Sequence, residues 1–173
     1  MAIPKNSESN ITKLLDRGFA SRHNSEESPR QSEPRQHVVI VTCMDTRINP
    51  YRIFNLVEGD VHLLRNAGGV ITDDVVRSIL ISQRLLNTTE VLVVQHTKCG
   101  LATFAGDQFK DEVERETQQR PEFEMEDFED VYESVKSSVS KLHANPYLTR
   151  TTHVRGFVYD VDQDQLEEVV VDQ

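Results

Sequence analysis

The sequence has no hydrophobic run long enough to span a bilayer, although 37% of its 173 residues are hydrophobic. Basic residues are also in deficit, because 19 Lys and Arg against 29 Asp and Glu give a formal net charge of −10. A surface with that balance repels nucleic acid and anionic lipid, whereas a small neutral substrate is unaffected by it. We therefore expect neither a nucleic-acid partner nor a membrane partner.

Cysteine is equally scarce, since the chain contains only Cys43 and Cys99. The first residues, MAIPKNSESNITKLLDRG, carry acidic side chains and no apolar secretory core, which counts against a signal or transit peptide. We therefore predict a cytoplasmic protein. A reducing compartment does not favour a disulfide, so both cysteines are interpreted as thiols.

The length fits one domain preceded by a polar N-terminal region. Residues 1–36 are predicted to form an amphipathic arm and a linker. Apolar residues recur at helical spacing in the arm, and HNSEESPRQSEPRQ is too polar and too rich in proline for a core. The arm, with Ile11, Leu14, Leu15 and Phe19, would pack on the domain or on a second subunit. Residues 37–173 are predicted to form the functional domain.

The pattern beyond His37 is typical of an α/β domain. The apolar runs VVIVTC and EVLVVQH, and the shorter DVHLLRN at 60–66, predict strands of a parallel sheet. Amphipathic helices are predicted at 73–86, capped by Thr72 or Asp73, and from Phe128 to Leu142. The C-terminal stretch predicts a strand and a hairpin partner at the sheet edge, and the acidic segment 107–130 a solvated helix face or loop. The expected fold is a mostly parallel central sheet of about four to five strands flanked by helices.

The two cysteines occupy equivalent places, each at or just past the C-terminal end of a predicted central strand. His96 lies three residues before Cys99 in H-T-K-C-G. Ligands bind beyond the carboxyl ends of such strands, and two thiolates with one imidazole form a good zinc site with one open position. However, buried cysteines are often small core residues, and His96 could be a core histidine with its hydrogen bonds satisfied. The spacing alone leaves both interpretations open.

Two charged residues follow the first cysteine in the run C-M-D-T-R at 43–47. A guanidinium at Arg47 would hold Asp45 ionised and oriented, although a surface ion pair or a helix cap would give the same pattern. Together with R-N-A-G-G at 65–69 and H-T-K-C-G at 96–100, the run closely resembles the β-carbonic anhydrases, particularly their short, minimal branch. The resemblance extends from about Val38 to the end of the chain and includes R-G-F-V-Y-D at 155–160.

The resemblance implies that residues 37–173 are a catalytic domain that reversibly hydrates carbon dioxide to bicarbonate through zinc-bound hydroxide. By position it implies one zinc ion per chain on Cys43, His96 and Cys99. It also implies Asp45 and Arg47 as the catalytic dyad, with Asp45 as a fourth ligand in a closed form. The family's cleft forms at a dimer interface, so a homodimer or dimer-based homo-oligomer is expected. The expected pocket residues are Asn66, Ala67, Gly68, Val70, Ile71 and Gly100.

Two alternatives keep the same zinc site. Members of this family include hydrolases of carbonyl sulfide and carbon disulfide, which are linear relatives of carbon dioxide. A second alternative is a non-catalytic zinc protein in which Asp45 is a permanent fourth ligand. The chain departs from the family pattern in the polar insert before the first strand and in Lys98, and neither departure removes a ligand.

Overall fold

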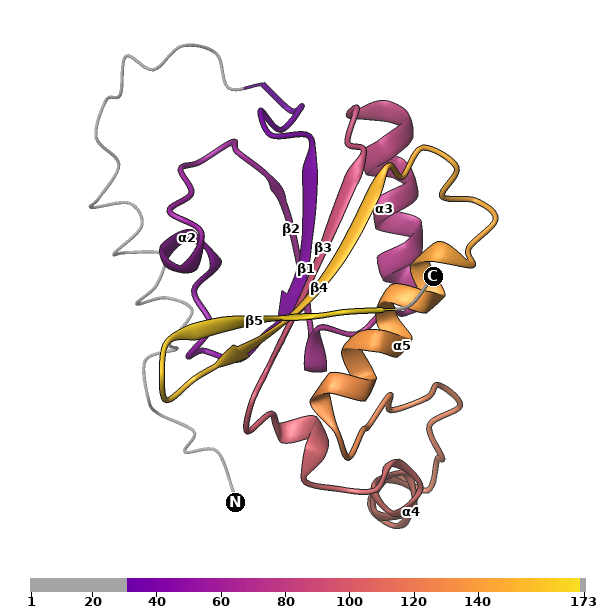
Figure 1. The fold of residues 1–173 in the computed structure, drawn as a ribbon. Coiled ribbons are helices and arrows are strands. Elements are labelled where there is room, and N and C mark those ends of the chain that lie inside the picture. Colours follow the sequence, from indigo (N-terminus) through magenta and orange to yellow (C-terminus); the bar gives the residue numbers. More distant parts are fainter. Residues whose placement is uncertain (1–30, 172–173) are drawn as a thin grey trace, which may run out of the picture. The chain divides into compact units, whose positions relative to one another are not determined.

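The computed structural model describes residues 31–171 (Figure 1). The predicted amphipathic arm and most of the predicted linker therefore lie outside the described residues. Within the described part of the chain, no helix combines the length and the apolarity needed to cross a bilayer.

A five-stranded sheet forms the centre of the domain, with the strand order β2-β1-β3-β4-β5. Its strands are β1 (Val38–Cys43), β2 (His62–Asn66), β3 (Glu90–His96), β4 (His153–Asp160) and β5 (Gln165–Val169). The first four pair in parallel, and β5 runs antiparallel to β4 as its hairpin partner. The predicted mostly parallel α/β fold is thus confirmed.

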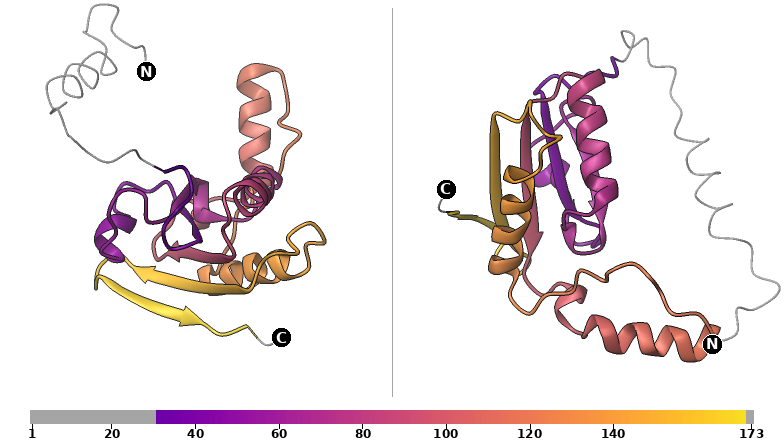
Figure 2. Two further views of the ribbon diagram at one scale, coloured as in Figure 1. Left: turned by 90° about the horizontal axis from the view of Figure 1, so that it is seen from above. Right: turned by 90° about the vertical axis from the view of Figure 1, so that its right-hand side faces the viewer.

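Helices cover both faces of this sheet (Figure 2). The helices α3 (Asp73–Leu85) and α5 (Val131–His143) lie on one face, and the short α2 (Pro50–Ile53) lies on the other. Because successive side chains of a strand alternate, Val39 and Val41 of β1 join the core under α3, whereas Ile40 joins the core on the α2 side. This burial on both faces explains the continuous apolar run of β1.

The helix ends follow local rules. Thr72, one of the two predicted caps, accepts a hydrogen bond from the Val75 N–H at 3.4 Å. The second predicted helix begins later than expected, at Val131, because Asp130 caps it and Phe128 lies before its start. Within the acidic segment, α4 (Gly106–Thr117) is helical and residues 118–130 return to α5 without a helix.

A glycine in β4 allows α5 to pack close to the sheet. A Cβ atom added to Gly156 would lie 2.4 Å from Val135 Cγ1 and 2.9 Å from Val139 Cγ2. Both valines are buried in the core between α5 and the sheet, so neither can move away. The close approach of α5 therefore requires a residue without a side chain at position 156.

Gly156→Ala should lower the free energy of unfolding by about 1–3 kcal/mol, because the added methyl group overpacks the core. The matched control is Gly100→Ala, where an added Cβ meets no atom within 4 Å. Urea denaturation monitored by circular dichroism measures both variants. Equal unfolding midpoints for the two would contradict the close packing of α5.

Candidate metal centre

Three ligating side chains converge at the carboxyl ends of β1 and β3. Cys43 ends β1, His96 ends β3, and Cys99 follows in the next loop. One ligand atom from each lies within 4.8 Å of the other two, and all three residues are buried. The two sulfur atoms are 4.0 Å apart. The fold therefore brings together all three residues that the sequence predicts as metal ligands.

The His96 ring is oriented for coordination. Its Nδ1 lies 2.9 Å from the Thr97 carbonyl oxygen, which can only accept, so Nδ1 carries the proton and donates it. The other nitrogen, Nε2, is then a lone-pair atom, and it has no hydrogen-bond partner among the described residues although the side chain is only 1% exposed. A core histidine with satisfied hydrogen bonds would not show this, whereas a metal ligand would.

The two thiols share one hydrogen bond, in which either sulfur can be the donor. This contact lowers the pKa of Cys43 to about 4 despite its burial. The same contact, together with burial, raises the pKa of Cys99. A divalent cation would replace the proton of this hydrogen bond, and two sulfurs with one imidazole nitrogen suit a borderline-soft metal.

A carboxylate and a guanidinium border the cluster. Arg47 donates from Nε to Asp45 Oδ1 at 3.0 Å and from Nη2 to Asp45 Oδ2 at 2.7 Å. These bonds hold the pKa of Asp45 well below its usual range, so the carboxylate is ionised at neutral pH. Asp45 Oδ2 is 3.8 Å from His96 Nε2, which places the charged oxygen beside the three ligands.

Arg65 supports the same turn and was missed by sequence reasoning. Its Nε donates to the Cys43 carbonyl at 2.9 Å, and its Nη2 donates to the Asp45 carbonyl at 2.7 Å. The available signal was position, because Arg65 pairs in register with Thr42 on the adjacent parallel strand, one residue before Cys43. Arg65 therefore clamps the backbone that carries both the first ligand and the acid.

The predicted pocket residues do not all share one surface. Asn66, Ala67 and Val70 line a cavity of about 420 Å³, together with residues of β2, the start of α3 and residues 123–126. Gly68 is buried against Leu101, while Gly100 follows Cys99 and is exposed. Ile71 instead belongs to the core under α3, where Val39 and Val75 surround it.

Ile71 is therefore less suited than Val70 to contact a substrate. The local hydrogen bonds explain this difference. The Asn66 side chain bonds both the N–H and the carbonyl of Val70, and the chain then turns inward to begin α3.

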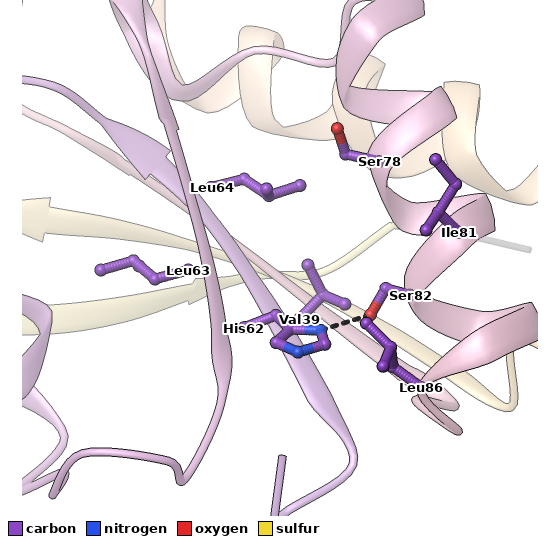
Figure 3. Close-up of a pocket in the computed structure, with 8 residues that line it drawn as sticks. All are labelled: Val39, His62, Leu63, Leu64, Ser78, Ile81, Ser82 and Leu86. Carbon is purple, nitrogen blue, oxygen red and sulfur yellow. Dashed lines mark hydrogen bonds between the residues drawn. The ribbon is translucent and has the colours of Figure 1, made fainter. Parts of the chain in front are cut away.

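A second cavity, of about 270 Å³, lies between β2 and α3 (Figure 3). Its walls are mostly apolar, and His62 reaches across it to Ser82, with 2.7 Å between Nδ1 and Oγ. Because His62 Nε2 lies 3.1 Å from the Ser32 carbonyl and donates to it, Nδ1 accepts from the Ser82 hydroxyl. None of the predicted site residues lines this cavity, so it is separate from the metal centre.

Comparisons with known proteins agree with the motifs. Residues 38–166 match a family model described as carbonic anhydrase. The chain is 45% identical over 141 residues to β-carbonic anhydrase 1 of Mycobacterium tuberculosis, which covers 82% of this chain and 86% of that protein. It is 30% identical over 153 residues, 75% of each chain, to a carbon disulfide hydrolase of an Acidianus species. A carbonic anhydrase structure from Streptococcus mutans superposes with a TM-score of 0.85 at 33% identity, covering 95% of this chain and 100% of that one.

In the metal-free protein, the ultraviolet absorbance of the thiolate should titrate with a midpoint near pH 4, which reports the lowered pKa of Cys43. Cys99→Ala removes the contact with the Cys43 sulfur and should move the midpoint upward, so that the thiolate is lost as the pH falls through a higher value. The matched control is Cys99→Ser, whose hydroxyl still donates and should keep the midpoint low. Identical midpoints for the two variants would refute the shared hydrogen bond.

Proposed function

The chain belongs to the β-carbonic anhydrase family, and from that premise we propose that it binds one zinc ion through Cys43, His96 and Cys99 and catalyses the reversible hydration of carbon dioxide. The observation that carries this proposal is the convergence of the three ligand atoms within 4.8 Å, with His96 Nε2 buried and unpartnered among the described residues. Zinc fits this donor set, because three protein ligands of sulfur and nitrogen leave a fourth position for water or substrate.

When bound, zinc supplies the Lewis acidity that makes water nucleophilic near neutral pH. The protein's part is to bind the metal, to orient the attacking water and to exclude other water from the substrate. Two thiolates cancel the charge of the cation, so water is acidified less than it would be by three neutral histidines. Orientation by a nearby base must therefore contribute more in this protein.

Asp45 provides that orientation. Its carboxylate accepts the hydrogen of the attacking water and aims the oxygen lone pair at the substrate carbon. Arg47 fixes both carboxylate oxygens, and the low pKa of Asp45 ensures that it accepts rather than donates. Arg65 binds the backbone carbonyls of Cys43 and Asp45, which fixes the backbone that carries the Asp45 carboxylate. Preorganisation of this kind lowers the reorganisation needed in the transition state.

Carbon dioxide is small and apolar, so it needs a dry space rather than specific polar contacts. We place it beside Val70 and the backbone of Ala67 and Gly68, next to the 420 Å³ cavity. The exposed Phe123 also borders that cavity, and a second subunit would cover it. This arrangement supports a homodimer or dimer-based oligomer, since two-fold interfaces dominate homo-oligomers.

A hydrolase of carbon disulfide or carbonyl sulfide is the second candidate, because a carbon disulfide hydrolase is 30% identical to this chain. The ligand set and the acid–guanidinium pair would serve either substrate. Discrimination between linear triatomic gases depends on the width of the approach path, and apolar pockets discriminate weakly between such similar molecules. The identity to a β-carbonic anhydrase is higher, at 45%, and this favours carbon dioxide over the sulfur compounds as the proposed substrate.

A permanently closed, non-catalytic zinc site is the remaining alternative. It requires Asp45 to leave Arg47 and bind the metal at all times. The bidentate contact with Arg47 argues against this, because a carboxylate held by two charge-assisted bonds is already satisfied.

Asp45→Asn should reduce carbon dioxide hydration by about 10²-fold or more, since an amide cannot act as the hydrogen acceptor in the same geometry. Zinc should remain at one ion per chain, whereas Cys43→Ser should weaken zinc binding and abolish turnover. The measurement is stopped-flow hydration at mildly alkaline pH on protein of known metal content. Asp60→Asn, which alters a paired carboxylate remote from the cluster, is the control and should keep full activity. Full activity in Asp45→Asn would remove its proposed role.

Turnover of carbon dioxide, carbonyl sulfide and carbon disulfide on one preparation separates the two enzymatic candidates. We expect carbon dioxide to give the highest kcat/KM. Faster release of hydrogen sulfide from either sulfur compound would reassign the substrate and leave the metal site unchanged. Stoichiometric zinc with no turnover of any of the three gases would instead favour the closed site.

A further inference from the structure

The turn between β4 and β5 is the feature that the site description leaves unexplained. Its sequence is D-V-D-Q-D at 160–164. Asp160 Oδ1 accepts from the backbone N–H groups of Asp162 and Gln163 at 2.8 and 2.9 Å, which fixes the turn internally. The Asp162 and Asp164 side chains project from this turn, and each contacts a segment next to the metal centre.

Asp164 connects the turn to α2, the helix that follows Asp45 in the chain. It accepts from the Tyr159 hydroxyl at 2.5 Å and pairs with Arg52 of α2 at 2.5 Å, while Arg52 also donates to the Tyr159 hydroxyl at 2.9 Å. The turn is thereby tied to α2, which comes five residues after Asp45 in the chain. These contacts hold the β4–β5 turn in place against α2.

Asp162 reaches the other ligand-bearing loop through Lys98, with which it forms an ion pair. Lys98 lies between the two ligands His96 and Cys99, and its φ of +56° is in the left-handed region that lysine rarely adopts. In this conformation its carbonyl accepts from Arg47 Nη2 at 2.9 Å. The same nitrogen holds Asp45, so the Lys98 peptide is the third partner of the acid–guanidinium pair.

The backbone alone does not fix this peptide. The Thr97 N–H donates to the Tyr159 carbonyl at 3.0 Å, and the Val161 N–H donates to the Thr97 hydroxyl at 3.2 Å. These two bonds hold Thr97 against the end of β4 but do not involve Lys98. Among the described residues, the polar contacts of Lys98 therefore come from side chains: Arg47 binds its carbonyl, and Asp162 binds its ammonium group.

We propose that Asp162 is a positioning residue for Arg47: its ion pair with Lys98 holds the left-handed peptide whose carbonyl fixes the guanidinium. Asp162 touches neither the ligands nor the acid. Its effect passes through one peptide group, so it depends on the Lys98 side chain. The hydrogen bond and charge of Asp45 raise the pKa of Arg47 most, and the charge of Asp162 adds a lesser contribution. Solvent screens this direct effect, because the Asp162 and Lys98 side chains are 61% and 63% exposed.

Asp162→Asn should lower kcat about three- to fivefold with KM unchanged, the size expected from loss of one exposed ion pair. Lys98→Met should have the same effect, and the double variant should lose no more than either single variant. Lys98→Gly should recover part of the rate, because glycine adopts the left-handed conformation without the ion pair. The control is Glu168→Gln, which breaks the Arg155 pair on the same hairpin and should leave kcat unchanged.

The kinetic part rests on the proposed hydration of carbon dioxide, so a second readout is independent of any reaction. In the zinc-loaded protein, the Arg47 Nε–H resonance, assigned with Arg47→Lys, should exchange slowly with water because it donates to Asp45. Exchange should quicken in Asp162→Asn and in Lys98→Met, with zinc content and the Glu168→Gln spectrum unchanged. Unaltered Arg47 exchange in Asp162→Asn, or a further loss on adding it to Lys98→Met, would overturn the proposal.

Discussion

The parallel pairing of β1 with β3 at the centre of the sheet is the constraint on which the rest of the molecule depends. The register aligns Thr42 with Val94, so both strands end at the same edge of the sheet, with His96 one residue beyond the level of Cys43. At this edge the ligand atoms of Cys43 and His96 lie within 4.8 Å of each other and of the Cys99 sulfur. Core packing on both faces keeps these two strands in register, which means that apolar burial sets the ligand geometry.

Around the sulfur and nitrogen ligands lie charged side chains that are held in place by hydrogen bonds. Two guanidinium groups do most of the positioning: Arg47 binds the carboxylate of Asp45, and Arg65 binds the carbonyls of Cys43 and Asp45. A planar guanidinium offers several donors in fixed directions, which suits this use better than an ammonium group would. Lys98 instead contributes through its carbonyl, and its side chain serves as a tether.

The sequence predicted the sheet, the two main helices and the three clustered residues because each has a local signature. The apolar run of β3 was placed at 90–96, the range that the structure has, since a strand buried on both faces leaves a continuous pattern. The contacts of Arg65 and Asp162 could not be predicted in this way. They join residues that are distant in the chain and depend on where turns place exposed side chains. Ile71 was expected in the pocket because it is apolar and close to the site in sequence. Its side chain instead lies in the core, because α3 begins directly after it.

The order of these parts along the chain has a consequence for biosynthesis. The two cysteines are separated by 56 residues, all within the β1–α3–β3 half of the domain, whereas Asp162 follows Lys98 by 64 residues. Both cysteines are therefore synthesised before β4 and β5. A nascent chain would thus possess its metal-binding residues well before the hairpin that braces the neighbouring loop.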